Sequence, residues 1–390
     1  MFYAAFFGVF GMVTPFLNVY FREGLGFSGR QIGLLSMFSP LMSLIVAIPL
    51  ASIADRYRCR IPMLITAIIG YATLMTFARL PRTFAVWAAV WLMATMFSSL
   101  TSPMADSLIA RMSFRHGLNY GSMRMWGSAT FAISAVICGG LWERFGLHAM
   151  FLSAGIIFFP TALFAFGLEE DRSAVVKSAP KVPLRAVLRD KPLLYLLAIT
   201  FFVGAATTTS VAYDGIYMNA LGGSGLFIGL LFSLSAFSEL PLMHFRGQIV
   251  RKLNTPNTLL LACAFFCIAF AGYAVAWRPW VLLIMTIVKG MGYGLFLASA
   301  VQFISERVPE HVASTVQSIF TATMSGLAPL TAAPIAGELY DRFGVKAVFF
   351  FITFSAVTAA LLLLATIANG AFRSPNTQEN PARGIAVSLS

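Results

Sequence analysis

The sequence predicts an all-α membrane protein whose twelve transmembrane helices form two six-helix halves. Three observations predict this fold: an apolar composition, a series of long apolar runs, and a repeat that relates the two halves. Of the 390 residues, 58% are hydrophobic and only 11% are charged, against roughly 25% charged residues in a typical soluble domain. A soluble fold of this size has too little polar surface to cover so many apolar side chains, whereas a bilayer solvates them.

The composition also excludes several classes of function. The net charge of +12 could indicate nucleic acid as a partner, but the basic residues fall between apolar runs rather than on one soluble segment. The four cysteines have neither metal-site nor disulfide spacing. No nucleophile–base constellation is evident, so we expect no enzyme, no metal and no cofactor. The first apolar run begins at Phe2 without a basic lead-in, so we predict no cleavable signal peptide and leave an upstream start codon open.

The apolar runs define the predicted spans, since a transmembrane helix needs about 20 mostly apolar residues. Runs of this length, separated by turn or charge signals, lie at 2–21, 31–51, 62–80, 84–105, 121–141, 147–168, 192–216, 226–246, 257–277, 280–303, 313–337 and 346–368. One long polar connection divides six spans from six. The predicted organisation is an N-terminal half at 1–168, a cytoplasmic central loop at 169–191, a C-terminal half at 192–368 and a disordered cytoplasmic tail at 369–390.

Lysine and arginine decide the expected orientation, because cytoplasmic loops of membrane proteins are enriched in both. With both termini in the cytoplasm, 17 of these residues fall on the cytoplasmic side and 8 on the outside. The remaining two, Arg124 and Lys289, lie inside predicted spans. We therefore expect a multi-pass protein of the inner (plasma) membrane with both termini cytoplasmic, and we expect it to be a monomer.

Two strings of the first half recur in related form in the second half. Leu25–Gly29 recurs 196 residues later as Leu221–Gly225, and Trp142–Gly146 recurs 198 residues later as Tyr340–Gly344. Nearly constant offsets at both ends of the unit indicate a duplicated six-helix unit in one orientation. Two such halves can rock about a central cavity and expose it alternately to each side of the membrane.

The loop after the second predicted span resembles a signature of the major facilitator superfamily. The segment Ala51–Arg60 is similar to the pattern G-x-L-a-D-R-x-G-R-K, although alanine and arginine replace its two glycines. In that family the loop stabilises the outward-facing state. The resemblance therefore implies a gating role for Asp55 and Arg56, which the segment retains.

A narrower resemblance covers nearly the whole chain. The strings Gly11–Leu17, Tyr120–Ser128 and Phe237–Leu240 look like a branch that contains 3-phenylpropionate permeases and lies near nucleoside–proton and lactose–proton symporters. This resemblance implies secondary transport of a small organic solute together with protons. It leaves the identity of the solute open.

Carboxyl groups inside predicted spans are candidates for function, because a charge at the bilayer centre is costly. Glu239 lies midway along the eighth span, where burial disfavours its charged form. We predict that it carries the proton, the alternative being a structural hydrogen bond to another helix. Asp214, in the outer part of the seventh span, is the second proton-coupling candidate; the alternative places it at the wetted outer interface.

Two basic residues lie inside predicted spans. Lys289 lies about halfway along the tenth span, too deep to reach the interface easily, so we expect it in the cavity, paired with Glu239, with Asp214 or with an anionic ligand. Arg124 lies near the cytoplasmic end of the fifth span, and we predict that it forms a gating pair with Asp106. The alternative for Arg124 is contact with lipid phosphates.

Aromatic residues and glycines provide further candidates. Tyr213, Tyr293 and Trp126 are candidates for the wall of the substrate cavity, where they would stack on an aromatic solute, although such residues also serve as packing or interfacial anchors. The string Gly290–Gly294 predicts a close crossing of two helices.

Three classes of function remain after this reading. The leading hypothesis is a proton-coupled symporter of a small organic solute, and the basic residues Lys289 and Arg124 favour an anion such as an aromatic carboxylate. The alternative is a drug or metabolite exporter of the same fold that works as a proton antiporter, since direction depends on coupling rather than fold. A membrane sensor is less favoured, because the sequence shows no added soluble domain.

Overall fold

The computed structural model describes residues 1–81, 83–117, 120–169 and 190–372, and within these ranges the chain is mostly helical and contains no strand. The N-terminal half contains α1 (Phe2–Val19), η1 (Tyr20–Gly24), α2 (Gly29–Met42), η2 (Ser43–Ala47), α3 (Ile48–Tyr57), α4 (Arg60–Phe77), α5 (Phe84–Arg115), α6 (Tyr120–Phe145) and α7 (Ala149–Ala165). The C-terminal half contains α9 (Lys191–Ala220), α10 (Gly225–Leu253), α11 (Thr255–Ala274), α12 (Pro279–Arg307), α13 (Glu310–Ala322), η3 (Thr323–Leu327), α14 (Ala328–Phe343) and α15 (Val345–Ala368). Elements labelled η are single turns of π-helix.

The prediction of twelve membrane-spanning helices is confirmed. In the described part of the chain, 11 helical segments are long and apolar enough to cross a membrane, and the shorter apolar helix α7 supplies the twelfth. Some helices continue beyond their predicted ends: α5 has 32 residues, α9 has 30 and α12 has 29. The hydropathy pattern ends at the first polar residues, but a helix satisfies its own backbone hydrogen bonds and can continue past the lipid.

Two of the π-helical turns share a local cause. η2 lies just before Pro49, and η3 lies just before Pro329. Proline has no N–H to donate and its ring clashes with the carbonyl group four residues earlier, so the regular ladder of hydrogen bonds widens there. η3 carries Ser325, which lines two cavities between the halves.

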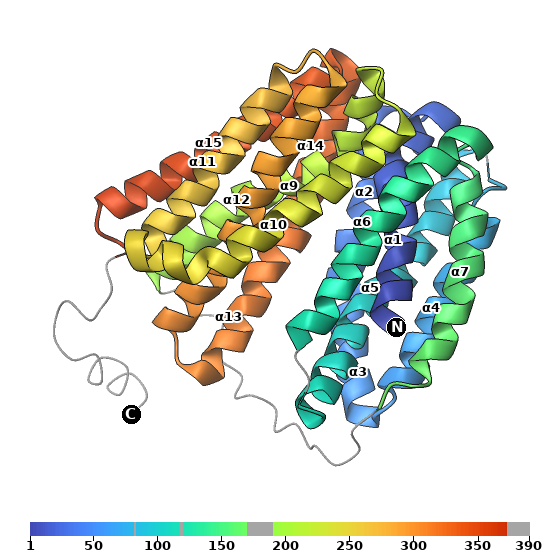
Figure 1. The fold of residues 1–390 in the computed structure, drawn as a ribbon, viewed down its shortest axis with the longest axis horizontal. Coiled ribbons are helices and arrows are strands. Elements are labelled where there is room, and N and C mark those ends of the chain that lie inside the picture. The colour runs from blue at the N-terminus through green and yellow to red at the C-terminus, as the bar shows by residue number, and fades with distance from the viewer. Residues whose placement is uncertain (82, 118–119, 170–189, 373–390) are drawn as a thin grey trace.

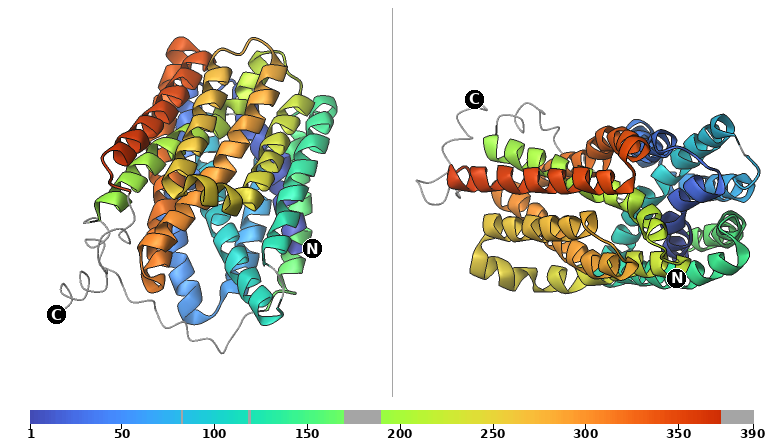
Figure 2. Two further views of the ribbon diagram at one scale, coloured as in Figure 1. Left: turned by 60° about the vertical axis from the view of Figure 1, so that its left-hand side comes forward. Right: turned by 90° about the horizontal axis from the view of Figure 1, so that it is seen from above.

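The two halves lie side by side and approach each other at one end, which is the upper end in Figure 1 and is seen from two further sides in Figure 2. Across the boundary α2 packs on α14, α6 on α10 and α1 on α9. We call the end that carries the loops 25–28 and 221–224 the closed end, and the opposite end the open end. Towards the open end, a groove of about 520 Å³ separates Pro103 of the first half from Ser314 of the second.

Two carboxylates at the closed end each cap a helix of the other half, beside an ion pair of Arg30 with Glu338 that also joins the halves. Asp341, near the end of α14, accepts hydrogen bonds from the backbone N–H groups of Gly29 and Arg30 at the start of α2, at 2.6 and 2.8 Å. Glu143, near the end of α6, accepts one from the N–H of Leu226 at the start of α10, at 2.8 Å. A carboxylate satisfies the free N–H groups of a helix N-terminus and interacts favourably with its dipole. We call these two contacts the reciprocal caps.

The reciprocal caps give the internal repeat a structural reason. The two carboxylates occupy corresponding positions of one repeated string, and the two capped helices begin at the end of the other string. A Cβ atom on Gly29 would lie 2.5 Å from the Gly337 carbonyl oxygen, and one on Gly225 would lie 2.6 Å from the Gly139 carbonyl oxygen. Only glycine permits this approach, so both strings encode the same close helix crossing.

We expect the double substitution Glu143→Ala/Asp341→Ala to open the closed end. Removing a side-chain helix cap costs about 1 kcal/mol, so losing both should shift the equilibrium towards opening by about 2 kcal/mol, or roughly thirtyfold. Spin labels at Arg79 and Lys346, which are exposed at the closed end, should then report a new population at longer distance. Glu306→Ala is the control, because the hydrogen bonds of the Glu306 carboxylate stay within the C-terminal half. An unchanged distance distribution in the double variant would contradict the role of the caps.

Candidate functional site

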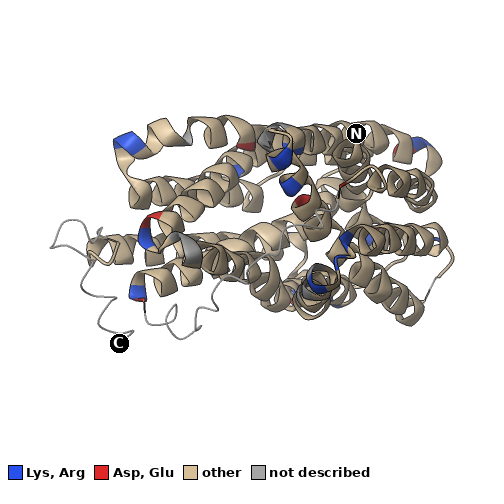
Figure 3. Ribbon diagram, turned by 90° about the horizontal axis from the view of Figure 1, so that it is seen from below, with Lys and Arg blue, Asp and Glu red and all other residues tan. Residues whose placement is uncertain are grey.

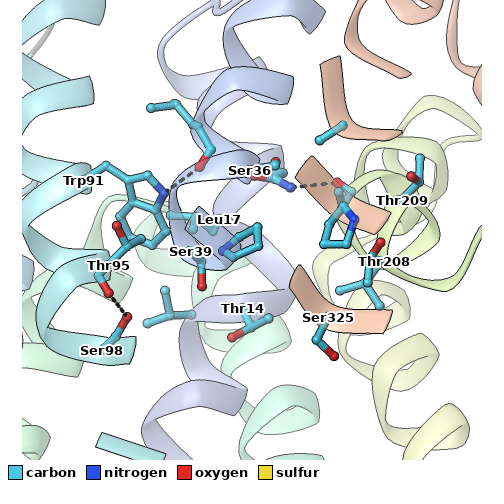
Figure 4. Close-up of a pocket in the computed structure, with 18 of the residues that line it drawn as sticks. Thr14, Leu17, Ser36, Ser39, Trp91, Thr95, Ser98, Thr208, Thr209 and Ser325 are labelled. Atoms are coloured by element: carbon cyan, nitrogen blue, oxygen red, sulfur yellow. Dashed lines mark hydrogen bonds between the residues drawn. The ribbon is translucent and has the colours of Figure 1, made fainter. Parts of the chain in front are cut away.

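Two neighbouring cavities lie between the halves. Their volumes are about 290 and 360 Å³, and they share Thr14, Thr208, Val211 and Ser325 in their walls. Sites for small molecules typically have volumes of roughly 300–1,000 Å³, so the two cavities together offer space for one small solute. We call the smaller one the hydroxyl-lined cavity (Figure 4) and the larger one the charged cavity.

The hydroxyl-lined cavity has no charged side chain among the residues that line it. Its polar side chains come from both halves: Thr14, Asn18, Ser36, Ser39, Tyr71, Trp91, Thr95, Ser98, Thr208, Thr209, Tyr213 and Ser325. Figure 4 shows labelled hydroxyl groups on several sides of the space. Asn18 also joins the halves, because its amide donates to the Ala212 carbonyl oxygen at 2.8 Å. The wall can therefore offer a neutral solute many donors and acceptors of hydrogen bonds.

Lys289 and Asp214 form a buried ion pair within the C-terminal half. The Lys289 Nζ atom lies 2.5 Å from Asp214 Oδ2, and the Ser210 hydroxyl donates to Asp214 Oδ1 at 2.8 Å. Asp214 is fully buried and Lys289 is 6% exposed. Buried charges are tolerated when a partner neutralises them and hydrogen bonds satisfy their remaining atoms. Asp214 is thus the partner of Lys289, and it does not lie at a wetted interface.

Glu239 of α10 lines the charged cavity together with Lys289 and Tyr293 of α12. The predicted glycine-rich crossing is present here: a Cβ atom on Gly294 would lie 2.7 Å from the Glu239 carbonyl oxygen. Among the described side chains, none hydrogen-bonds or pairs with the Glu239 carboxyl, although the charges of Lys289 and Arg124 act on it through space. The site therefore contains one carboxyl whose charge is matched and one that faces a cavity without a direct partner.

The two predicted gating partners Asp106 and Arg124 are bridged by residues of α1. The Tyr3 hydroxyl donates to the Asp106 carboxylate. The Arg124 guanidinium lies over the Phe7 ring, with its carbon 4.1 Å from the ring centroid. A cation over an aromatic face is attracted by the ring quadrupole. Phe7 was not among the predicted site residues, and only its i,i+4 spacing from Tyr3 at the start of the first span could have suggested it.

The other predicted site residues have different environments. Tyr213 lines the hydroxyl-lined cavity and Tyr293 lines the charged cavity. Trp126 is 66% exposed and lines neither. Arg56 is exposed at the end of α3, and the side chain of Asp55 lies outside what the structure describes. The gating role of this pair stays a prediction.

Sequence reasoning missed most of the polar wall. Ser210 lines neither cavity, but as the partner of Asp214 it could have been found, because it lies four residues before Asp214 and thus on the same helix face. The serines of α2 and the hydroxyl residues of α5 gave no usable signal. Isolated hydroxyl groups in apolar helices commonly bond to their own backbone, and nothing in their spacing separates those from cavity residues.

The family model described as MFS_1 like family matches residues 1–351. The chain belongs to this family. It is 26% identical to the maltose permease of Geobacillus stearothermophilus over 93% of this chain and 92% of that protein. It is also 26% identical to the probable 3-phenylpropionic acid transporter of Escherichia coli (strain K12), over 92% of this chain and 95% of that protein.

Solved structures extend the comparison to the fold. The crystal structure of the nucleoside transporter NupG matches with a TM-score of 0.82 at 15% identity, and covers 95% of this chain and 97% of that one. The predicted resemblance to the major facilitator superfamily is confirmed, and so is its twelve-helix fold. This MFS_1 like protein is therefore a multi-pass membrane transporter.

In this MFS_1 like protein, Lys289→Met would leave Asp214 buried without a counter-charge. Breaking a buried ion pair from one side costs about 3–5 kcal/mol, so we expect the Tm of the purified protein in detergent to fall clearly. Asp214→Asn/Lys289→Met removes both charges and should recover most of this loss. Thermal unfolding followed by fluorescence checks both variants. A double variant no more stable than Lys289→Met would show that the pairing does not account for the stability of this region.

Proposed function

We propose that this transporter is a proton-coupled symporter that carries a small, neutral, hydroxyl-rich solute across the inner membrane by alternating access. The observation that carries the proposal is the difference between two membrane-embedded carboxyls. Asp214 is neutralised by Lys289, whereas Glu239 faces the charged cavity without a direct partner among the described side chains. The hydroxyl-lined cavity, without charged side chains, lies directly beside it. Together they supply one site for a proton and one for a solute.

Glu239 is the proposed proton carrier. A carboxyl group in the wall of a cavity that opens in turn to each side can take up a proton on one side and release it on the other. Its protonated form is tolerated when the cavity closes around it, whereas an unpaired carboxylate is costly there. Asp214 suits this task less well, because it is fully buried and its charge is held by Lys289.

The composition of the cavity wall supports a neutral solute. Hydroxyl and amide groups without charges can replace the water molecules that hydrate a polyol or sugar. Lys289, the residue that favoured an anionic solute, is already matched by Asp214 and would add little to the binding of a carboxylate. The similarity to a maltose permease supports the same class of solute.

An aromatic carboxylate is the second candidate. The similarity to a probable 3-phenylpropionic acid transporter favours it. Phe10, Tyr71 and Trp91 provide aromatic surface in the wall of the hydroxyl-lined cavity. The carboxylate group of such a solute would need Arg124 as its cationic partner, but Arg124 lies over the Phe7 ring instead of in a cavity wall. An exporter that works as a proton antiporter would use the same two cavities and the same carboxyl group, since the direction of transport depends on coupling rather than on the fold.

We assign the open end to the cytoplasm. Cytoplasmic ends of membrane proteins are enriched in lysine and arginine, and those basic residues of that side in the sequence prediction that the structure describes lie at helix ends and loops of the open end. Figure 3 views this end and shows Lys and Arg on both halves. With this orientation the structure is inward-facing, and the reciprocal caps form the outer gate.

Addition of a transported solute to proteoliposomes should draw protons inward and alkalinise the external medium. A panel of maltose, uridine and 3-phenylpropionate separates the solute classes, and we expect a response to the hydroxylated solutes but not to 3-phenylpropionate. Glu239→Gln cannot carry a proton, so it should abolish accumulation against a gradient while solute-for-solute exchange continues. External pH and labelled-solute uptake are the measurements.

The matched control is Glu306→Gln, because Glu306 lines neither cavity. It should accumulate solute like the wild type. If Glu239→Gln still accumulates solute, Glu239 is not the carrier. A response to 3-phenylpropionate alone would favour the second candidate, and silence across the panel with folded protein would favour export.

A further inference from the structure

Three buried hydroxyl groups on α9, those of Thr200, Thr209 and Tyr213, lack a hydrogen-bond partner among the described residues, and the last two line the hydroxyl-lined cavity. Thr207 donates to the Val203 carbonyl oxygen at 2.8 Å, and Thr208 donates to the Gly204 carbonyl oxygen at 2.6 Å. The hydroxyl of Thr209 is buried, yet no described group accepts or donates a hydrogen bond to it. The same holds for the Tyr213 hydroxyl, one turn further along. Thr209 is 3% exposed and Tyr213 is 1% exposed.

Such groups need a physical reason. A buried hydroxyl without a partner loses its hydration and gains nothing in return, so native proteins contain few of them. The threonines beside Thr209 show that a backbone partner is available on this helix. In a transporter that alternates between two states, a group unsatisfied in one state can be satisfied by a ligand in the other.

Both residues lie in the wall of the hydroxyl-lined cavity. They are four residues apart, so they lie on one face of α9. The Tyr213 ring packs on Tyr340 of α14, with centroids 5.6 Å apart. Next to Tyr340 is Asp341, one of the reciprocal caps. The pair therefore lies between the cavity and the contacts that shut the closed end.

Opening the closed end must uncover this part of the cavity. Its wall includes Leu35 and Ser36 of α2 and Ala333 of α14, and α2 packs on α14. The two helices approach closely, since a Cβ atom on Gly33 would lie 2.5 Å from the Ala333 carbonyl oxygen. When the halves separate at this end, α2 leaves α14, and the part of the cavity wall that contains Thr209 and Tyr213 opens towards this end.

We propose that Thr209 and Tyr213 form an outer subsite that hydrogen-bonds a hydroxyl group of the solute while the closed end is open. The subsite rests on the proposed function, since it requires alternating access and a hydroxylated solute. It explains why the two hydroxyls are unpaired in the present state, in which the packing of α2 on α14 shuts this side of the cavity. It also makes Tyr213 a specificity-determining residue that contacts both the solute and a helix of the outer gate.

The test is the binding of maltose to detergent-purified protein by calorimetry, in two backgrounds. In the opened background Glu143→Ala/Asp341→Ala, Tyr213→Phe should weaken maltose binding about tenfold, the effect of one lost hydrogen bond to a buried group. In the background with intact caps the same substitution should leave the affinity unchanged. Its Tm should not fall, because it removes a hydroxyl that has no partner.

The matched control is Tyr217→Phe, one turn further along α9. The Tyr217 hydroxyl donates to the carbonyl oxygens of Tyr273 and Ala276 at 3.0 and 3.2 Å and lines neither cavity. It should lower the Tm and leave maltose binding in the opened background unchanged. Equal binding by Tyr213→Phe and the parent in the opened background overturns the subsite, as does absence of maltose binding there. Loss of proton movement in proteoliposomes with the binding pattern intact would instead overturn the proposed symport alone.

Discussion

Within a bilayer no water completes the hydrogen bonds of a buried polar group, so the chain must supply every partner itself. Most polar groups in the described helices obey this constraint. The hydroxyls of Thr207 and Thr208 bond to their own backbone, and the ion pair of Lys289 and Asp214 is completed by Ser210. The exceptions near the boundary between the halves line cavities. The other described buried groups without a partner, on Trp87, Thr200, Tyr273, Ser299 and Gln302, line neither cavity, so an unmet hydrogen bond points to a path for solute only where it coincides with a cavity wall.

The same constraint separates the roles of the two halves. The charged residues that line the two cavities, Glu239 and Lys289, and the Lys289 partner Asp214 all belong to the C-terminal half, on α10, α12 and α9. The N-terminal half contributes hydroxyl, amide and indole groups from α1, α2 and α5 to the wall of the hydroxyl-lined cavity. Duplication therefore produced two similar scaffolds with different cavity chemistry. The two halves remain equivalent at the closed end, where the reciprocal caps come from repeated strings of the sequence and make corresponding contacts in the structure.

The sequence was sufficient for features that follow from length, apolarity and repetition. It predicted twelve spans, two related halves and a set of buried charges, because each leaves a local signal. It could not choose between Glu239 and Asp214 as the partner of Lys289, since that choice depends on how α9, α10 and α12 cross. Nor could it place Tyr3 beside Asp106, because these residues are 103 positions apart and come from different helices.

The reciprocal caps also bear on how such a protein could have begun. Asp341 caps a helix of the first half and Glu143 caps the corresponding helix of the second, from corresponding positions. In a pair of identical six-helix chains, one carboxylate would make both contacts, which is the pattern of an isologous two-fold interface. A single ancestral unit with one such acid could therefore have closed as a homodimer before the genes were joined, and fusion would then have freed each cavity wall to diverge.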